Sequence, residues 1–161
     1  AGACGGSCRP MVVRALQQFG AEGGANLHLV DSLLRSNEAH KHRLFEYASQ
    51  DLAPGARVLM VGLAFKAGTD DLRESPNVDL ARKLLAVGFD LKIYDTAVQA
   101  DMLIGANLGY AYSQLPSLES LLIDKAEAEG QSFDRVVINN ATSKDLDLSR
   151  QADMRDLGSL T

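Results

Sequence analysis

The sequence has no tryptophan, only two cysteines and no long apolar run. Cys4 and Cys8 are too few for the disulfide framework of a small secreted domain, so we expect a reducing, cytoplasmic location. No stretch of about 18 apolar residues is present and the first residues lack a signal peptide's pattern, so we expect no membrane partner. The net charge of −5 predicts no nucleic-acid partner, because such a partner requires a basic face. The three histidines are scattered and indicate no metal site.

What the sequence does have is an ordinary globular composition. Of its 161 residues, 46% are apolar and 23% are charged, which is enough to bury a core in one domain with an appendage. The sequence starts with Ala1 rather than methionine, and we expect it to be part of a longer protein.

The first 53 residues have the pattern of a helical arm. A short helix is expected from Pro10 to Phe19, before glycines at positions 20, 23 and 24. A second helix is expected over residues 26–52, where apolar side chains recur at helical spacing. At about 1.5 Å per residue this helix would span roughly 40 Å, more than the rest of the chain needs to cover one face. We therefore predict a homodimer in which this helix packs against a second copy of itself.

From Pro54 and Gly55 onward, short apolar runs alternate with helical patterns. The apolar run over residues 57–64 is typical of a strand buried on both faces. Ser75 followed by Pro76 predicts a helix start, with a side-chain cap and a proline in the first turn. Further strands are expected at residues 90–94 and 134–138, and further helices around residues 98–105 and 117–129. This alternation predicts an α/β fold, with a Rossmann-like parallel sheet and helices at residues 54–161, preceded by the helical arm at residues 1–53.

The sequence Gly-Gly-Ser-Cys-Arg-Pro at residues 5–10 places a thiol on a glycine-rich turn. Glycines such as Gly5 and Gly6 let the backbone approach a ligand, and neighbouring N–H dipoles and Arg9 would favour a thiolate. Cys8 is therefore a candidate nucleophile. The alternative is a small buried cysteine without a chemical role.

A second motif occupies residues 65–76, directly after the first expected strand. That strand would deliver Phe65 and Lys66 to the carboxyl edge of the sheet, where open α/β sheets bind ligands. The Lys66 ammonium suits phosphate or sugar hydroxyls, and the forked Arg73 guanidinium suits a pyrophosphate. The two aspartates between these cations would orient them. The alternative is an ordinary charged loop that caps a helix.

These two motifs, together with Leu34–Asn37, resemble the UDP-glucose/GDP-mannose dehydrogenase family, and its GDP-mannose branch in particular. Enzymes of this family oxidise a nucleotide sugar with NAD in two hydride transfers. The resemblance implies that Cys8 is the nucleophile that holds the aldehyde intermediate covalently between the two oxidations.

The resemblance also assigns ligand contacts to individual residues. It implies that a nucleotide sugar of the GDP-mannose or UDP-glucose type is contacted by Gly5, Gly6, Phe65 and Lys66. It implies that Arg73 reaches toward the pyrophosphate of the NAD cofactor. The long helix at residues 26–52 would correspond to the dimerisation helix of the family.

The chain departs from the family pattern in two respects. Met11 and Val12 stand where the family has lysine and aspartate, and valine cannot accept a proton or hold a water molecule. No glycine fingerprint of an NAD domain is present, so we expect no tight NAD binding to this chain alone and interpret Asp95 as a turn residue. We predict sugar-nucleotide binding and dimerisation without turnover by this chain alone. Whether it is an enzyme stays open; a non-catalytic scaffold and a folded remnant without ligand are the alternatives.

Overall fold

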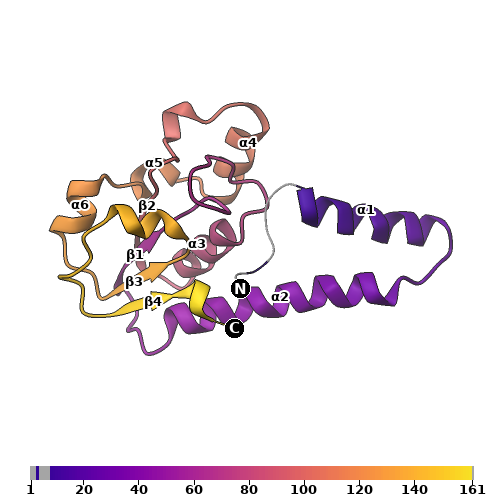
Figure 1. Cartoon of the computed structure of the whole chain (residues 1–161), viewed down its shortest axis with the longest axis horizontal. Helices are drawn as coiled ribbons and strands as arrows, with labels where there is room; N and C mark the ends of the chain where they lie inside the picture. Colours follow the sequence, from indigo (N-terminus) through magenta and orange to yellow (C-terminus); the bar gives the residue numbers. More distant parts are fainter. Residues whose placement is uncertain (1–2, 4–7, 161) are drawn as a thin grey trace.

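The computed structural model of the chain describes Ala3 and residues 8–160, with only the backbone at residues 8–10. Helix α1 (Cys8–Glu22) and helix α2 (His28–Ser49) run antiparallel and project from an α/β domain as an arm (Figure 1). The chain packs closely where the two helices connect: a Cβ atom added to Gly20 of α1 would lie 2.6 Å from the side chain of Leu27, just before α2. The arm differs from the prediction in its bounds: α1 is longer at both ends and contains Gly20, and α2 is shorter than residues 26–52.

A four-stranded parallel sheet forms the centre of the domain. The strands are β1 (Arg57–Val61), β2 (Asp90–Tyr94), β3 (Arg135–Ile138) and β4 (Met154–Asp156), in the order β2-β1-β3-β4. Every pairing is parallel, which confirms the predicted Rossmann-like α/β fold. The edge strand β4 was not predicted, because it has three residues and none of them is buried.

The central strand β1 is covered on both faces. Val58 and Met60 belong to the larger core, which includes side chains of α2 and of α3 (Pro76–Ala86). Leu59 and Val61 belong to a second core on the other face, which includes Ala128 of α6 (Lys125–Gly130). Two buried faces explain why this strand reads as a continuous apolar run rather than as an alternation.

The helices between β2 and β3 differ from those expected. The expected helix at residues 117–129 is wrong: α5 (Leu118–Leu121) ends early, and α6 starts anew at a capping box formed by Asp124 and Glu127. Between them, Leu122 pairs with Ile93 as a β-bridge. The expected helix at residues 98–105 is also wrong. A 3₁₀ turn (Ala100–Met102) stands there, and α4 covers Gly105–Gln114. Two more 3₁₀ turns lie at Ala141–Asp145 and Leu157–Ser159.

The base of the arm is built into the domain. Leu44 and Ala48 of α2 are buried in the larger core. Arg135 at the start of β3 is 2% exposed and donates hydrogen bonds to the carbonyls of Ala48 (3.0 Å) and Gln50 (2.6 Å) at the end of α2. The predicted domain boundary after residue 53 stays a prediction. Within the described ranges, no helix combines the length and apolarity needed to cross a membrane.

Candidate functional site

The polypeptide turns sharply where β1 ends. The strand stops at Val61 rather than at residue 64, because Gly62 has a φ of +93°, outside the range of a strand. The N–H groups of Leu63 and Ala64 donate to one carboxylate oxygen of Asp95, at 2.8 and 3.1 Å. The other carboxylate oxygen of Asp95 accepts from the N–H of Ala97 (3.0 Å), as expected for the predicted turn residue. Asp95 thus also occupies the backbone donors that a phosphate would use at this point of the sheet.

The side-chain amides of buried Asn77 and of half-buried Asn139 and Asn140 hold the same turn. A Cβ atom on Gly62 would lie 2.5 Å from the amide of Asn140, so only glycine fits here without a shift. Asn139 donates to the carbonyl of Gly62 (2.7 Å), and Asn77 donates to the carbonyl of Ala64 (2.7 Å). The turn is therefore a rigid base from which the next residues project toward solvent.

Phe65 and Lys66 follow this base directly. Phe65 is half-buried and Lys66 is exposed, with its ammonium 5.4 Å from the centre of the Phe65 ring. Asn107 of α4 fixes the far side of the loop: its side chain donates to the carbonyl of Asp70 (2.8 Å) and accepts from the N–H of Leu72 (2.9 Å). Lys66 is thus an exposed cation on an anchored loop, an arrangement suited to an anionic or hydroxyl-rich ligand.

Arg73 lies at the end of the loop and forms a bidentate ion pair with the carboxylate of Asp71. Its Nε and Nη2 atoms donate to the two oxygens of Asp71, at 2.9 and 3.0 Å. This hydrogen bonding, reinforced by the charge of Asp71, raises the pKa of Arg73 above its ordinary value. The orienting role predicted for the aspartates is thus seen for Asp71. A pyrophosphate that engages Arg73 would have to share it with Asp71 or displace that carboxylate.

A cavity of about 510 Å³ lies between α1 and the loop that carries Arg73. It is lined by Met11, Arg14, Ala15, Gln18, Arg73, Glu74, Ala106 and Tyr110. Burial, chiefly, raises the pKa of the Tyr110 phenol still further above neutral pH, and the protonated hydroxyl can donate a hydrogen bond. The lining combines two guanidinium groups, the Glu74 carboxylate and a phenol with apolar side chains, which suits a ligand that has both polar and apolar parts.

The structure brings part of the predicted site together. Met11, at one of the two positions that depart from the family pattern, lines the same cavity as Arg73. Val12 is 52% exposed on α1. Cys8 begins α1, but its side chain lies outside the described residues, as do Gly5 and Gly6. The roles predicted for these residues, and for Phe65, Lys66 and Arg73, stay predictions.

Three positions were missed by the sequence analysis. Asn107 anchors the loop from α4, 35 residues away in sequence, and nothing in its local pattern marks it. Arg14 and Glu74 form an ion pair of 3.0 Å across 60 residues, and each reads locally as a solvent-exposed charge. Long-range pairing of ordinary residues leaves no periodic signal in a sequence.

The described residues do not fit an NAD pyrophosphate at the turn after β1. The backbone donors there are bonded to Asp95, and the turn lacks the glycine pattern that lets a pyrophosphate approach. Nor do the described ranges contain a group of three or more histidine, cysteine or acidic side chains placed to hold a metal ion.

A parallel sheet with a cation-bearing loop at its carboxyl edge is the architecture of the Rossmann-like α/β domains. Residues 59–154 match the UDP-glucose/GDP-mannose dehydrogenase family, UDP binding domain, and the chain belongs to this family.

Curated relatives and solved structures agree with this assignment. The GDP-mannose 6-dehydrogenase of Pseudomonas putida KT2440 is 41% identical over 93% of this chain, and that of Pseudomonas aeruginosa PAO1 is 39% identical over 91%. The crystal structure of a ternary complex of GDP-mannose dehydrogenase from P. aeruginosa superposes with a TM-score of 0.74 and 38% identity over 87% of this chain. A UDP-glucose dehydrogenase from Pyrobaculum islandicum, 24% identical, shares the fold with a TM-score of 0.73 over 95%. The chain spans about a third of the length of these proteins: 34%, 33%, 32% and 37% respectively.

Proposed function

We propose that this chain binds a nucleotide sugar of the GDP-mannose type through the loop of residues 65–73, as part of a nucleotide-sugar dehydrogenase. One observation carries the proposal: Lys66 is an exposed cation on a loop that Asn107 anchors, directly after β1 at the carboxyl edge of the parallel sheet, where open α/β sheets bind ligands. We expect Lys66 and Phe65 to contact the sugar nucleotide, and the family resemblance assigns Gly5 and Gly6 to the same ligand. The relatives named GDP-mannose 6-dehydrogenase, at 41% and 39% identity, favour GDP-mannose over UDP-glucose.

In the proposed chemistry, Cys8 captures the aldehyde and Arg73 faces the cofactor. We expect no turnover by this chain alone, because Val12 cannot act as a base and the turn after β1 does not fit an NAD pyrophosphate. We place the protein in the cytoplasm, where nucleotide sugars and NAD are available.

Isothermal titration calorimetry of the purified chain tests the proposal, with GDP-mannose, UDP-glucose and NAD titrated in parallel. We expect saturable binding of GDP-mannose, weaker binding of UDP-glucose, and no saturable heat with NAD. Circular dichroism of the same sample establishes that the protein is folded. A folded chain that gives no heat with either sugar nucleotide would contradict the proposal and favour a scaffold role.

We also propose that the arm forms a homodimer, because six of its large apolar side chains are exposed: Met11, Val12, Leu16, Phe19, Leu29 and Leu33. Val12, Leu16 and Phe19 follow the i, i+4, i+7 spacing of a single helix face, and Phe19 is 69% exposed. An apolar stripe of this kind on a projecting helix pair is stabilised when a second copy covers it. This assembly role also suits the alternative of a dimerising scaffold without catalysis.

Replacing both Leu16 and Phe19 with glutamate is expected to convert the dimer to a monomer. Burying a large apolar side chain contributes about 1.5–3 kcal/mol, and a symmetric interface loses both side chains twice, so the dimer should weaken by at least about ten-thousandfold. Sedimentation equilibrium measures this change. The matched control is Ile104→Glu, which changes a 77% exposed apolar residue of the domain outside the arm and should leave the dimer intact. A wild-type chain that stays monomeric at micromolar concentration would contradict the prediction.

A further inference from the structure

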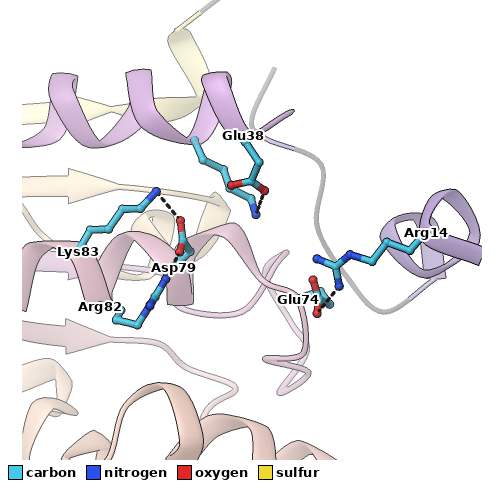
Figure 2. Close-up of polar contacts among 7 residues, drawn as sticks. Arg14, Glu38, Glu74, Asp79, Arg82 and Lys83 are labelled. Atoms are coloured by element: carbon cyan, nitrogen blue, oxygen red, sulfur yellow. Dashed lines mark hydrogen bonds and ion pairs between the residues drawn. The ribbon is translucent and has the colours of Figure 1, made fainter. Parts of the chain in front are cut away.

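Hydrogen bonds tie helix α1 to the rest of the chain near its connection to α2, at Gln17, whose side chain donates to Asp31 of α2 (2.7 Å), and at Arg14. At its far end, the connection to α2 is closed by a hydrogen bond of 2.8 Å from the N–H of Ala25 to the carbonyl of Gly20. In its first half, Nη1 of Arg14 donates to Oε1 of Glu74 at 3.0 Å. Figure 2 shows the Arg14 side chain extending from α1 to Glu74, on the loop before α3. The connection to α2 fixes one end of α1, and the Arg14–Glu74 pair fixes its placement near the other.

Glu74 is itself held in one backbone conformation. Its φ is +54°, in the left-handed region that non-glycine residues rarely adopt. Its neighbours are anchored: the N–H of Arg73 donates to Asp71 (3.1 Å), and the hydroxyl of Ser75 donates to the carbonyl of Leu63 (2.8 Å). Glycine would take this conformation without strain, so the presence of glutamate indicates that its side chain is used. The carboxylate is held where it meets Arg14.

Arg14 and Glu74 pair with each other, and the other carboxylates drawn in Figure 2 pair with other cations. Hydrogen bonding to Glu74 is the largest cause of a pKa of Arg14 raised above its ordinary value. The remaining carboxylates drawn in Figure 2 have cations of their own at 2.8 Å: Lys41 for Glu38, and Arg82 and Lys83 for Asp79. Arg14 and Glu74 line both the cavity of about 510 Å³ and a more polar one of about 210 Å³.

The pair joins the two motifs of the site. Arg14 lies on the helix that begins at Cys8, about 9 Å further along the helix axis. Glu74 follows Arg73 directly in the sequence. We propose that Arg14 is a positioning residue, whose ion pair with Glu74 sets the placement of α1 and Cys8 relative to the loop that carries Lys66 and Arg73. The inference rests on the proposed function for the roles of Cys8 and the loop, but the placement itself can be measured without a ligand.

The first measurement is the distance between two spin labels, one on Cys8 and one on a cysteine replacing the exposed Ala86 at the end of α3, in a Cys4→Ser background. Double electron–electron resonance, with unlabelled protein added to suppress distances between copies, gives the distance distribution. We expect a narrow distribution in the otherwise unchanged chain and a broader one in Arg14→Gln and in Glu74→Gln. The reversed pair, Arg14→Glu with Glu74→Arg, should restore the narrow distribution.

The second measurement is GDP-mannose affinity by calorimetry in the same variants without labels. Exposed ion pairs have modest effects, so each single variant should bind about two- to fivefold more weakly and the reversed pair should bind like the wild type. The matched control is Arg82→Gln: Arg82 is 54% exposed and paired at 2.8 Å, while Arg14 is 56% exposed and paired at 3.0 Å. This control should change neither the distance nor the affinity.

The two measurements test the positioning role of Arg14 and the proposed sugar-nucleotide binding separately. Single variants whose distance distributions match the wild type would overturn the positioning role, whatever the affinities are. A distance that depends on Arg14, in a chain that binds no sugar nucleotide, would support the positioning role and contradict the proposed function. A reversed pair that stays as broad as the single variants would also overturn the proposal, because restoration requires the direct pairing of these two charges.

Discussion

Replacing Arg135 with methionine is expected to lower the free energy of unfolding by about 3 kcal/mol, the lower end of the cost of breaking a buried ion pair. The Arg135 side chain is 3% exposed and donates to Asp153 at 2.6 and 3.0 Å. It also donates to the carbonyls of Ala48 and Gln50, which end α2 and have no partner within the helix. Methionine would fill most of the space but leave these carbonyls without a donor. Asp153 is 38% exposed and can be hydrated, which limits the loss.

Urea unfolding at a fixed protein concentration measures this effect as a change in the midpoint at a constant slope. Arg135→Lys keeps the positive charge, but a lysine ammonium lacks the forked shape with which the guanidinium reaches Asp153 and the two carbonyls at once. We therefore expect a smaller loss of about 2 kcal/mol in the free energy of unfolding. The control is Arg82→Met, which removes a half-exposed arginine from a surface pair and should stay within about 0.5 kcal/mol of the wild type. If Arg135→Met were as stable as that control, the anchoring of α2 by Arg135 would be wrong.

Local patterns were sufficient to predict most of the fold. The apolar run at β1 identified a strand covered on both faces, and the structure has a core on each side of it. Ser75 was predicted to cap a helix that starts with proline, and its side chain accepts a hydrogen bond from the N–H of Asn77 at the start of α3. A helix cap, the spacing of apolar residues and a continuous apolar run all depend on residues that are neighbours in the sequence, so they can be recognised from the sequence directly.

The details of the site depend on contacts that a single sequence does not display. Asp95 was interpreted correctly as a turn residue, but nothing in its neighbourhood indicated that it would bind two N–H groups about 30 residues earlier. The break between α5 and α6 arises because Leu122 pairs with Ile93 in the sheet, which overrides a continuous helical pattern. Tertiary contacts determine these features, so helical spacing alone could not predict them.

Replacing Lys66 with alanine is expected to weaken GDP-mannose binding by about 10- to 100-fold, the range for the loss of a hydrogen bond from a charged donor. Lys66 follows a turn that is fixed by Asp95 and by the side-chain amides of Asn77 and Asn139, so ligand binding has a small entropy cost for ordering this loop. Lys66 is exposed and its ammonium lies 5.4 Å from the centre of the Phe65 ring, so its removal should leave the unfolding midpoint unchanged. Calorimetry on the wild type and the variant measures the difference.

Two controls determine how a loss of binding at Lys66 is interpreted. Lys144→Ala removes another exposed lysine of the domain, and an equal loss there would indicate a general charge effect rather than a contact. Arg73→Ala tests the other end of the loop: because Arg73 is already paired with Asp71, its removal should weaken sugar-nucleotide binding less than the removal of Lys66. If Arg73→Ala lost more affinity than Lys66→Ala, the ligand would lie in the cavity beside α1 rather than at the start of the loop. That result would move the contact site from Lys66 to the residues around Arg14 and Tyr110, which line that cavity.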